Sequence, residues 1–457
     1  MLTVLALIAC LTGPGILAIP YIRLPCAERL PLVVAISATA TFLVTWICFL
    51  LDLPAWTAIV WCGGCAIAAL AGWQTWQRLL QRPSAQFCLC GTLLTTLVVL
   101  LLQSSIFAYH GGGWTGDWFE HYQRAEFFLD RDNPLEARFL PPVNYLLPAR
   151  PPLFNVIAAH IMAVTGRTFA NYQIIAGVLN SLLCLPLLAL TIRFLRVAGV
   201  RRLPGLTAVN AAIVLLPSFM QNATFPWTKS LTSFFVLTAL LQVSHLGALD
   251  RGGFRRGGLI GMLLAAAVLT HYSALVYVVV IGSWLCWWAF LQRPRNCLGI
   301  IGGGLLCGLP LVAVWLSYVA LVFGWEAIFG TTSAYADAAG LGWQENLKKI
   351  LQNLYDTVVP HYFRSRPVVV STLMQQPSWL GQLRDYWFLP LQVNFPSAVG
   401  TLAPITLIGI GLQLASHWPQ QQSQRLSRFF WVWVFTAGIF LGVAVHGGRD
   451  AAGLAHI

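Results

Sequence analysis

Three side chains that could do chemistry lie close together in one polar stretch of the sequence. Asp117, Glu120 and His121 open a segment, 117–132, whose apolar residues have helical spacing. Positions i, i+3 and i+4 lie on one helix face. Two acids and an imidazole on one face can abstract a proton or hold a divalent cation. The alternative is that Asp117 caps a helix whose polar face is solvated.

An arginine in a proline-rich segment is a second candidate. Residues 140–154 contain five prolines, which keep the chain extended, and Arg150 is followed directly by a short apolar segment, 153–165. Rigid neighbours would hold Arg150 at the membrane interface. There its guanidinium could bind an anion or anchor the chain at lipid headgroups. The sequence leaves both roles open.

Three further positions suit anion binding. Lys229 is one of three lysines in the chain and stands where an apolar helix is predicted to begin. A lysine there adds its charge to the positive end of the helix dipole, which favours phosphate. His271 interrupts a long apolar run, and Arg449 follows two glycines near the end of the chain. The alternatives are snorkelling for Lys229 and a satisfied turn histidine for His271.

The elements that must position these groups are membrane helices. Of 457 residues, 58% are hydrophobic and 9% are charged, against about 25% charged in a soluble domain. The 19 tryptophans and 26 phenylalanines exclude a disordered chain. The net charge of +12 comes mainly from arginines in short clusters between apolar runs, a pattern that orients membrane helices. We therefore predict an all-α, polytopic transmembrane helical bundle and no nucleic-acid partner.

About twelve apolar segments are predicted to span the membrane. They cover residues 2–19, 31–51, 54–72, 88–108, 173–192, 205–219, 229–248, 257–273, 274–291, 297–323, 398–416 and 429–446. Segment 153–165 is too short to cross, and we expect it to lie at the interface or to re-enter. Counting the spans alternately places all six short basic connections on one side, which the positive-inside rule assigns to the cytoplasm. The N-terminus then faces outward, as do two long loops, 109–152 and 324–397.

The chain divides into three parts. Residues 1–108 hold N-terminal helices, 109–291 form a core with a first outer loop 109–172, and 292–457 hold C-terminal helices with a second outer loop 324–397. Within the second loop, the apolar spacing predicts an amphipathic helix over 343–358. The final residues carry no polar tail, so we expect an incomplete C-terminus. The predicted location is the inner or plasma membrane, with lipids as partners and the site on the extracytoplasmic face.

Eleven cysteines lie outside the two long loops, nearly all in or beside apolar segments, which argues against a disulfide framework outside the membrane. The pair Cys62-x-x-Cys65 has the spacing of a redox or zinc site, but no second pair or histidine lies near it in the sequence. We interpret the pair as helix packing and predict no dedicated metal site.

Asp117 and the sequence Arg150-Pro-Pro-Leu153 resemble motifs of the GT-C glycosyltransferases. The closest likeness is to the branch with protein O-mannosyltransferases and bacterial lipid A aminoarabinose transferases. These enzymes carry an acidic pair in the first outer loop and a basic-Pro-Pro-Leu motif downstream. The resemblance covers about residues 105–290. It differs in that Trp118 follows Asp117, which leaves Glu120 as the acidic partner, and in that about three extra helices precede the loop.

The resemblance implies an inverting glycosyltransferase. It would move a sugar from a polyprenyl-phosphate donor in the outer leaflet to an acceptor of unknown identity, whether lipid, glycan or protein. Asp117 and Glu120 would be the catalytic carboxylates. The groups expected to bind the donor phosphate and substrate are Lys229, His271, Arg150, Arg449 and His121. A divalent cation is a possible cofactor and no other is implied.

Other functions remain open. A lipid-linked polysaccharide polymerase or ligase would also have large outer loops with arginines, and it would require those arginines rather than Asp117. A transporter or flippase would be equally basic and polytopic, but such proteins have paired repeats and ionisable residues near the midplane. Here no clear repeat is found and the polar residues collect at one face. A structural subunit without activity of its own is the last alternative.

Overall fold

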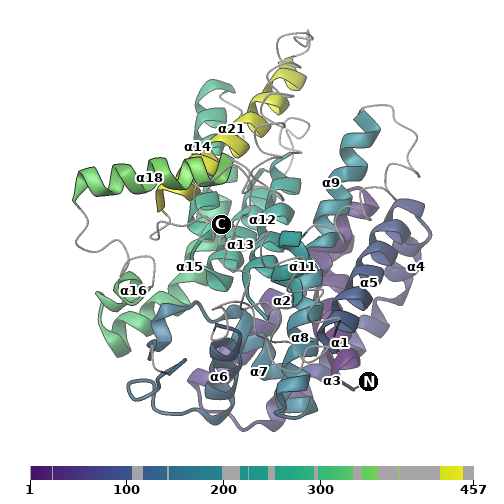
Figure 1. Ribbon diagram of the computed structural model, residues 1–457. Coiled ribbons are helices and arrows are strands. Elements are labelled where there is room, and N and C mark those ends of the chain that lie inside the picture. The colour runs from purple at the N-terminus through teal and green to yellow at the C-terminus, as the bar shows by residue number, and fades with distance from the viewer. Residues whose placement is uncertain are drawn as a thin grey trace.

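The structure is a computed structural model that describes residues 2–22, 24–104, 117–141, 144–197, 217–224, 226–244, 253–292, 297–332, 342–358, 379 and 422–445. The described residues form helices joined by turns and loops, and they contain no strand (Figure 1). A single antiparallel bridge joins Phe139 and Tyr145. The predicted all-α class is confirmed.

The helices of the first half are α1 (Leu2–Ala18), η1 (Ile19–Tyr21), α2 (Cys26–Leu50), α3 (Trp56–Ala71), α4 (Trp73–Leu80), α5 (Pro83–Ser104), α6 (Asp117–Asp130), η2 (Leu147–Ala149), α7 (Leu153–Thr165), α8 (Phe169–Ser181) and α9 (Cys184–Val197). Those of the second half are α11 (Pro217–Thr224), α12 (Lys229–Val243), α13 (Gly253–Thr270), α14 (Ala274–Gln292), α15 (Cys297–Phe323), α16 (Ala327–Gly330), α18 (Trp343–Val358) and α21 (Gln422–Val445).

Six helical segments of the described chain are long and apolar enough to cross a membrane. They are Leu2–Tyr21, Cys26–Leu50, Pro83–Ser104, Phe169–Arg193, Gly253–Thr270 and Leu298–Phe323. The pair α3 and α4, bent by 58°, makes a seventh if it is one broken span. The apolar helices α12, α14 and α21 are shorter by this measure. Twelve spans are therefore not confirmed, and segment 398–416 and most of 205–219 lie outside the described residues.

Helices α13 and α15 approach each other through glycines. A Cβ built at Gly257 would collide with the carbonyl oxygen of Ile300, and one at Gly261 would collide with that of Gly304. This small-xxx-small spacing lets membrane helices pack backbone to backbone. Such close packing matters because apolar side chains surrounded by lipid gain little from being buried between helices. The contact holds the first half of α13 against α15, and His271 follows the opposite end of α13.

The Gly261→Ala variant is therefore expected to lower stability. The added methyl must push α13 away from α15, and overpacking of this kind costs about 1–3 kcal/mol. Thermal unfolding in detergent would measure the loss. The control is Gly302→Ala on α15, because a Cβ at Gly302 meets nothing within 4 Å. Equal unfolding temperatures for the two variants would contradict the close approach.

Each end of the bundle has its own set of polar contacts. At one end, Arg193 of α9 lies 3.8 Å from the buried carboxylate of Glu28 and donates to the carbonyl of Ser244, just after α12. At the other end, Lys229 begins α12 and interacts electrostatically with His271, just after α13. With 18 residues, α13 separates the two ends by about 27 Å. This arrangement agrees with the predicted alternation of helix directions.

Helix α7 differs from the expected interfacial helix. Every residue from Leu153 to Met162 is buried, and α7 packs against α1, α2, α3, α6, α8 and α13. An interfacial helix would keep one polar face in water, whereas α7 is a short helix inside the bundle. It lies with α6 at the lower end in Figure 1.

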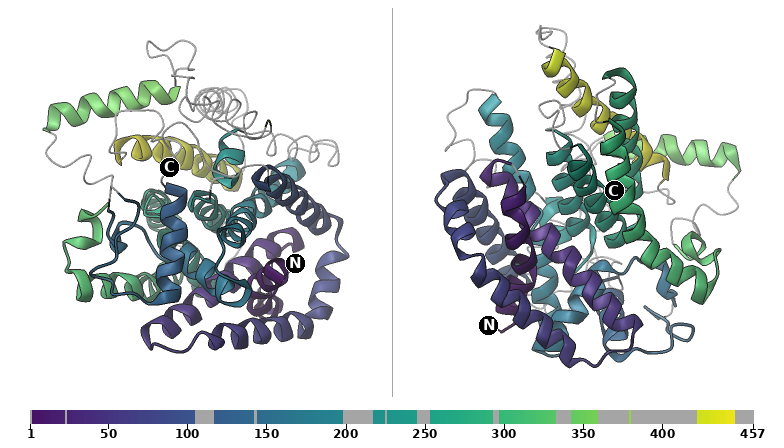
Figure 2. Two further views of the ribbon diagram at one scale, coloured as in Figure 1. Left: turned by 60° about the horizontal axis from the view of Figure 1, so that its bottom comes forward. Right: turned by 180° about the vertical axis from the view of Figure 1, so that it is seen from behind.

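Helix α18 spans the residues predicted for it from the apolar spacing, Trp343–Val358. Its large apolar side chains Trp343, Leu347, Leu351 and Tyr355 are exposed. The helix lies beside α21, away from the α1–α8 bundle (Figure 2).

Candidate functional site

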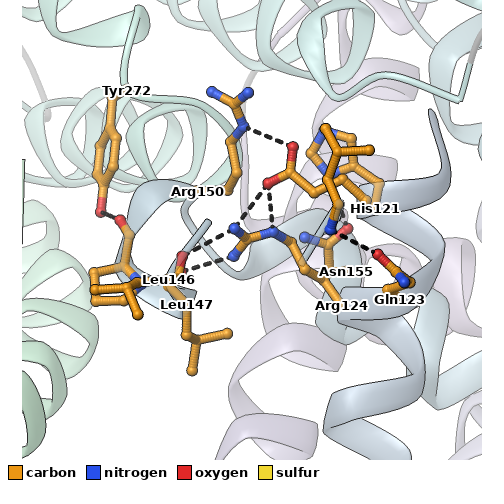
Figure 3. Close-up of polar contacts among 11 residues, drawn as sticks. His121, Gln123, Arg124, Leu146, Leu147, Arg150, Asn155 and Tyr272 are labelled. Atoms are coloured by element: carbon orange, nitrogen blue, oxygen red, sulfur yellow. Dashed lines mark hydrogen bonds and ion pairs between the residues drawn. The ribbon is translucent and has the colours of Figure 1, made fainter. Parts of the chain in front are cut away.

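The centre of the site is a buried carboxylate held by two arginines (Figure 3). Glu120 of α6 is fully buried, and its Oε1 accepts a hydrogen bond of 2.8 Å from Arg124, one turn further along the helix. Its Oε2 lies 3.5 Å from Nε of Arg150. A buried carboxylate is stable only when it is paired in this way. Glu120 thus ties α6 to the segment that precedes α7.

Arg124 fixes the proline-rich segment. Its two Nη atoms donate to the carbonyls of Leu147 and Leu146, at 2.7 and 3.0 Å, and its guanidinium lies 4.3 Å from the ring centre of Phe139. The Arg124 side chain is only 1% exposed, so each of these contacts replaces a hydrogen bond to water that was lost on burial. The extended stretch before Arg150 is therefore held rigidly against α6.

A second set of hydrogen bonds fixes the other side of this segment. The Tyr272 hydroxyl donates to the carbonyl of Pro148 at 3.1 Å, and Nε1 of Trp315 donates to the Tyr272 hydroxyl at 2.9 Å. The guanidinium of Arg150 lies 5.3 Å from the ring centre of Tyr145. Residues from α6, the α13–α14 turn and α15 thus hold the segment that carries Arg150. The prolines around Arg150 predict a rigid segment there.

The two arginines keep Glu120 ionised. Burial alone would raise the pKa of this carboxyl, but the charges of Arg150 and Arg124 outweigh it and lower the pKa to about 2. A carboxylate with so low a pKa is a weak base, so Glu120 is better suited to hold Arg150 than to accept a proton.

His121 faces α7 from the same turn of α6. Its Nδ1 lies 3.3 Å from Oδ1 of Asn155. An amide oxygen only accepts, so this contact assigns the proton to Nδ1 of His121. Asn155 therefore joins the site, although nothing in its sequence context singles it out.

His271 is neutral, and its proton position is defined. Burial lowers its pKa well below 6.5, and the nearby charges of Lys229, Arg150 and His121 lower it further. The Ser273 backbone N–H donates to Nδ1 at 3.2 Å, so the hydrogen-bond pattern puts the ring proton on Nε2. His271 can therefore donate one hydrogen bond without carrying charge.

Lys229 lies at the N-terminus of α12. Its Nζ is 4.5 Å from the ring centre of Trp227. The hydroxyl of Thr228, the residue before the helix, is 1% exposed and makes no hydrogen bond within the described part of the chain. Backbone N–H groups, an ammonium and a hydroxyl at one helix start form an arrangement that favours an anion.

Stability should fall as the pH drops below about 6.5, the ordinary pKa of histidine. Between that value and the lowered pKa of His271, the unfolded chain binds a proton that the folded chain excludes. The free energy of unfolding therefore decreases as the pH falls through this range. Glu120 contributes only at lower pH, between 4.5 and about 2. Thermal unfolding of the protein in detergent across this range measures the effect. In His271→Gln the unfolding temperature should depend less on pH just below 6.5. An unchanged slope in that variant would contradict the assignment.

The structure brings most of the predicted site residues together. Glu120, His121 and Arg150 lie in one cluster of contacts, and Lys229 and His271 interact electrostatically beside it. Asp117 is the first residue of α6, one turn before Glu120, but its side chain lies outside the described residues, as does all of Arg449.

Besides Asn155, two residues that hold the site were missed from the sequence, Arg124 and Tyr272. Arg124 could have been found, because it stands four residues after Glu120, the spacing of a helical ion pair. Tyr272 could not, because its partners Pro148 and Trp315 are distant in the chain.

The chain matches no known family model, no curated protein and no solved structure.

Proposed function

We propose that this protein is an inverting glycosyltransferase of the GT-C kind. It transfers a sugar from a polyprenyl-phosphate donor to an acceptor on the extracytoplasmic side of the membrane. The likeness of Asp117 and Arg150-Pro-Pro-Leu153 to the motifs of that family supports the reaction class. The apolar helices support a lipid-borne donor, because an embedded site is readily reached from the bilayer.

The observation that carries the proposal is the convergence of positive groups from separate segments. Lys229 at the start of α12, Arg150 before α7 and His121 on α6 all lie near enough to His271, in the turn after α13, to lower its pKa. The buried Thr228 hydroxyl, which makes no hydrogen bond to any of the described residues, adds a donor there. Such a positive, partly water-excluded region suits a phosphate, which is held by charged donors and by a helix N-terminus.

The chemistry requires few groups. A sugar phosphate loses its phosphate as a stable anion, so the leaving group needs electrostatic support and no proton. One base then suffices to take the proton from an acceptor hydroxyl or amine. Asp117 fills that role in the proposal, and a single displacement inverts the anomeric carbon.

Each remaining residue has a distinct part. Lys229 and the neutral Nε2–H of His271 donate to the phosphate. Glu120 positions Arg150 through Nε, and the Nη atoms point away from the carboxylate (Figure 3). In the proposal these Nη atoms bind the phosphate. His121 adds to the positive potential. Arg449 completes the clamp in this proposal.

A donor panel tests the proposal. Purified protein in lipid nanodiscs is incubated with radiolabelled polyprenyl-phosphate sugars and membrane extract, and the products are separated and their anomeric configuration is determined. Transfer from a lipid-phosphate sugar with inversion is the expected result. Transfer of a preassembled glycan from a polyprenyl diphosphate would instead indicate a polymerase or ligase. Movement of an intact lipid between leaflets without bond cleavage would indicate a flippase.

A further inference from the structure

A second polar cluster lies inside the bundle, away from the site above. The thiols of Cys10 on α1 and Cys62 on α3 are 3.2 Å apart, and Nε2 of His160 on α7 is 3.6 Å from the sulfur of Cys62. All three residues are buried, and their ligand atoms lie within 4.8 Å of one another. The histidine that the sequence did not place beside Cys62 is therefore supplied by a helix almost a hundred residues away.

The protons in this cluster are arranged as a metal ligand requires. Thr45 donates its hydroxyl proton to the carbonyl of Thr41 at 2.7 Å, so its oxygen can only accept from Nδ1 of His160, which lies 2.8 Å away. That contact puts the ring proton on Nδ1 and turns the lone pair of Nε2 toward Cys62. Histidine ligands of metals are commonly fixed by such a bond from the other ring nitrogen.

We propose that Cys10, Cys62 and His160 bind one zinc ion, which joins α1, α3 and α7. Tetrahedral zinc with bonds of about 2.3 Å to sulfur and about 2.0 Å to nitrogen separates a sulfur from a nitrogen ligand by about 3.5 Å. The observed 3.6 Å fits this value. Two sulfurs would stand about 3.8 Å apart, so the two thiols need to separate by about half an ångström on binding.

Charge favours zinc among the metals that bind thiolates. On binding, Zn²⁺ displaces one proton from each of the two thiols, and the resulting centre of two thiolates, one neutral imidazole and one dication has no net charge. A neutral centre is the least costly inside a membrane bundle, whereas Cu⁺ with the same ligands leaves one negative charge. Cys65, one turn along α3, interacts with Cys10, but as a third thiolate it would give the centre a negative charge, so we leave it out of the ligand set.

A route to the cluster is present. A cavity of about 50 Å³ is lined by His160, Thr45 and Cys48, and also by Arg131, whose side chain is partly exposed. The cavity therefore reaches His160 from the bundle surface, while Cys10 and Cys62 lie behind it. Since α7 also carries Asn155, the partner of His121, the zinc ion gives the N-terminal helices a structural role: they hold α7 in place.

Metal analysis tests the proposal. Protein without a histidine tag is expressed with zinc, purified in detergent without chelators, and measured by mass spectrometry for zinc per chain. One zinc ion per chain is expected for the wild type. Cys62→Ser and His160→Gln should each lose most of it, and Cys184→Ser, a buried cysteine on α9 outside the cluster, should keep it.

A second measurement does not depend on the variants folding. Wild-type protein stripped with a chelator and reloaded with Co²⁺ should show thiolate-to-cobalt charge-transfer absorption, and Zn²⁺ should abolish that absorption and raise the unfolding temperature. Absence of zinc and of the cobalt band in the wild type would overturn the site. Zinc retained in Cys62→Ser would overturn the ligands, and preferential binding of Cu⁺ would overturn the assignment of the metal.

Discussion

Asp117→Asn is expected to lower the rate of sugar transfer by about 10² to 10⁴, because the variant removes the one base of the proposed reaction. Asparagine caps a helix start as well as aspartate does, so α6 should form equally well. Single-turnover transfer from a labelled polyprenyl-phosphate sugar measures the loss, while donor binding should be nearly unchanged.

The matched control is Asp132→Asn, an exposed aspartate just after α6. It should transfer sugar at the wild-type rate. Full activity in Asp117→Asn would remove Asp117 from the mechanism. Loss of activity together with a lowered unfolding temperature would point instead to a role for Asp117 in starting the helix.

Glu120→Gln is expected to give the largest loss of stability, about 3–5 kcal/mol. The variant removes the charge that keeps Arg124 and Arg150 together, and it leaves two guanidiniums facing each other in a buried site. Since Arg124 also holds the Leu146 and Leu147 carbonyls, the segment before α7 should loosen as well. Unfolding temperature in detergent, with proteolysis of residues 139–150, measures both effects.

The control for this variant is Glu136→Gln, which changes an exposed glutamate on the same loop and should alter stability by no more than about 0.5 kcal/mol. Replacing both members of the shorter pair, Glu120→Leu with Arg124→Met, should recover part of the loss, since only Arg150 then loses its carboxylate. Equal stability of Glu120→Gln and the wild type would show that the buried ion pairs are not required.

Local pattern was enough to predict several elements. The start of α6 at Asp117, the start of α12 at Lys229 and the whole of α18 follow from apolar spacing and helix-start residues. The alternating helix directions follow from the arginine clusters, and the contact of Arg193 with Glu28 agrees with them. These features depend on residues that are close in sequence, or on charge summed over short loops.

Features set by distant contacts could not be predicted in this way. The pairing of Glu120 with Arg150 depends on how the proline-rich segment folds back over α6, and the burial of α7 depends on six neighbouring helices. Cys62 lacked a histidine within its own stretch of sequence, so its contact with His160 was not expected. Periodicity identifies which face of a helix is apolar, but it does not identify which helix will cover that face.

The most direct measurement of the central claim is binding of a short-chain polyprenyl phosphate to the detergent-solubilised protein by titration calorimetry. Saturable binding is predicted, weakened about 10- to 100-fold in Lys229→Met, because a charge-assisted hydrogen bond contributes about 1.5–3 kcal/mol. Lys348→Met, on the exposed side of α18, should bind like the wild type. Absence of saturable binding, or equal affinity in Lys229→Met and the wild type, would contradict the phosphate site and the transferase proposed on it.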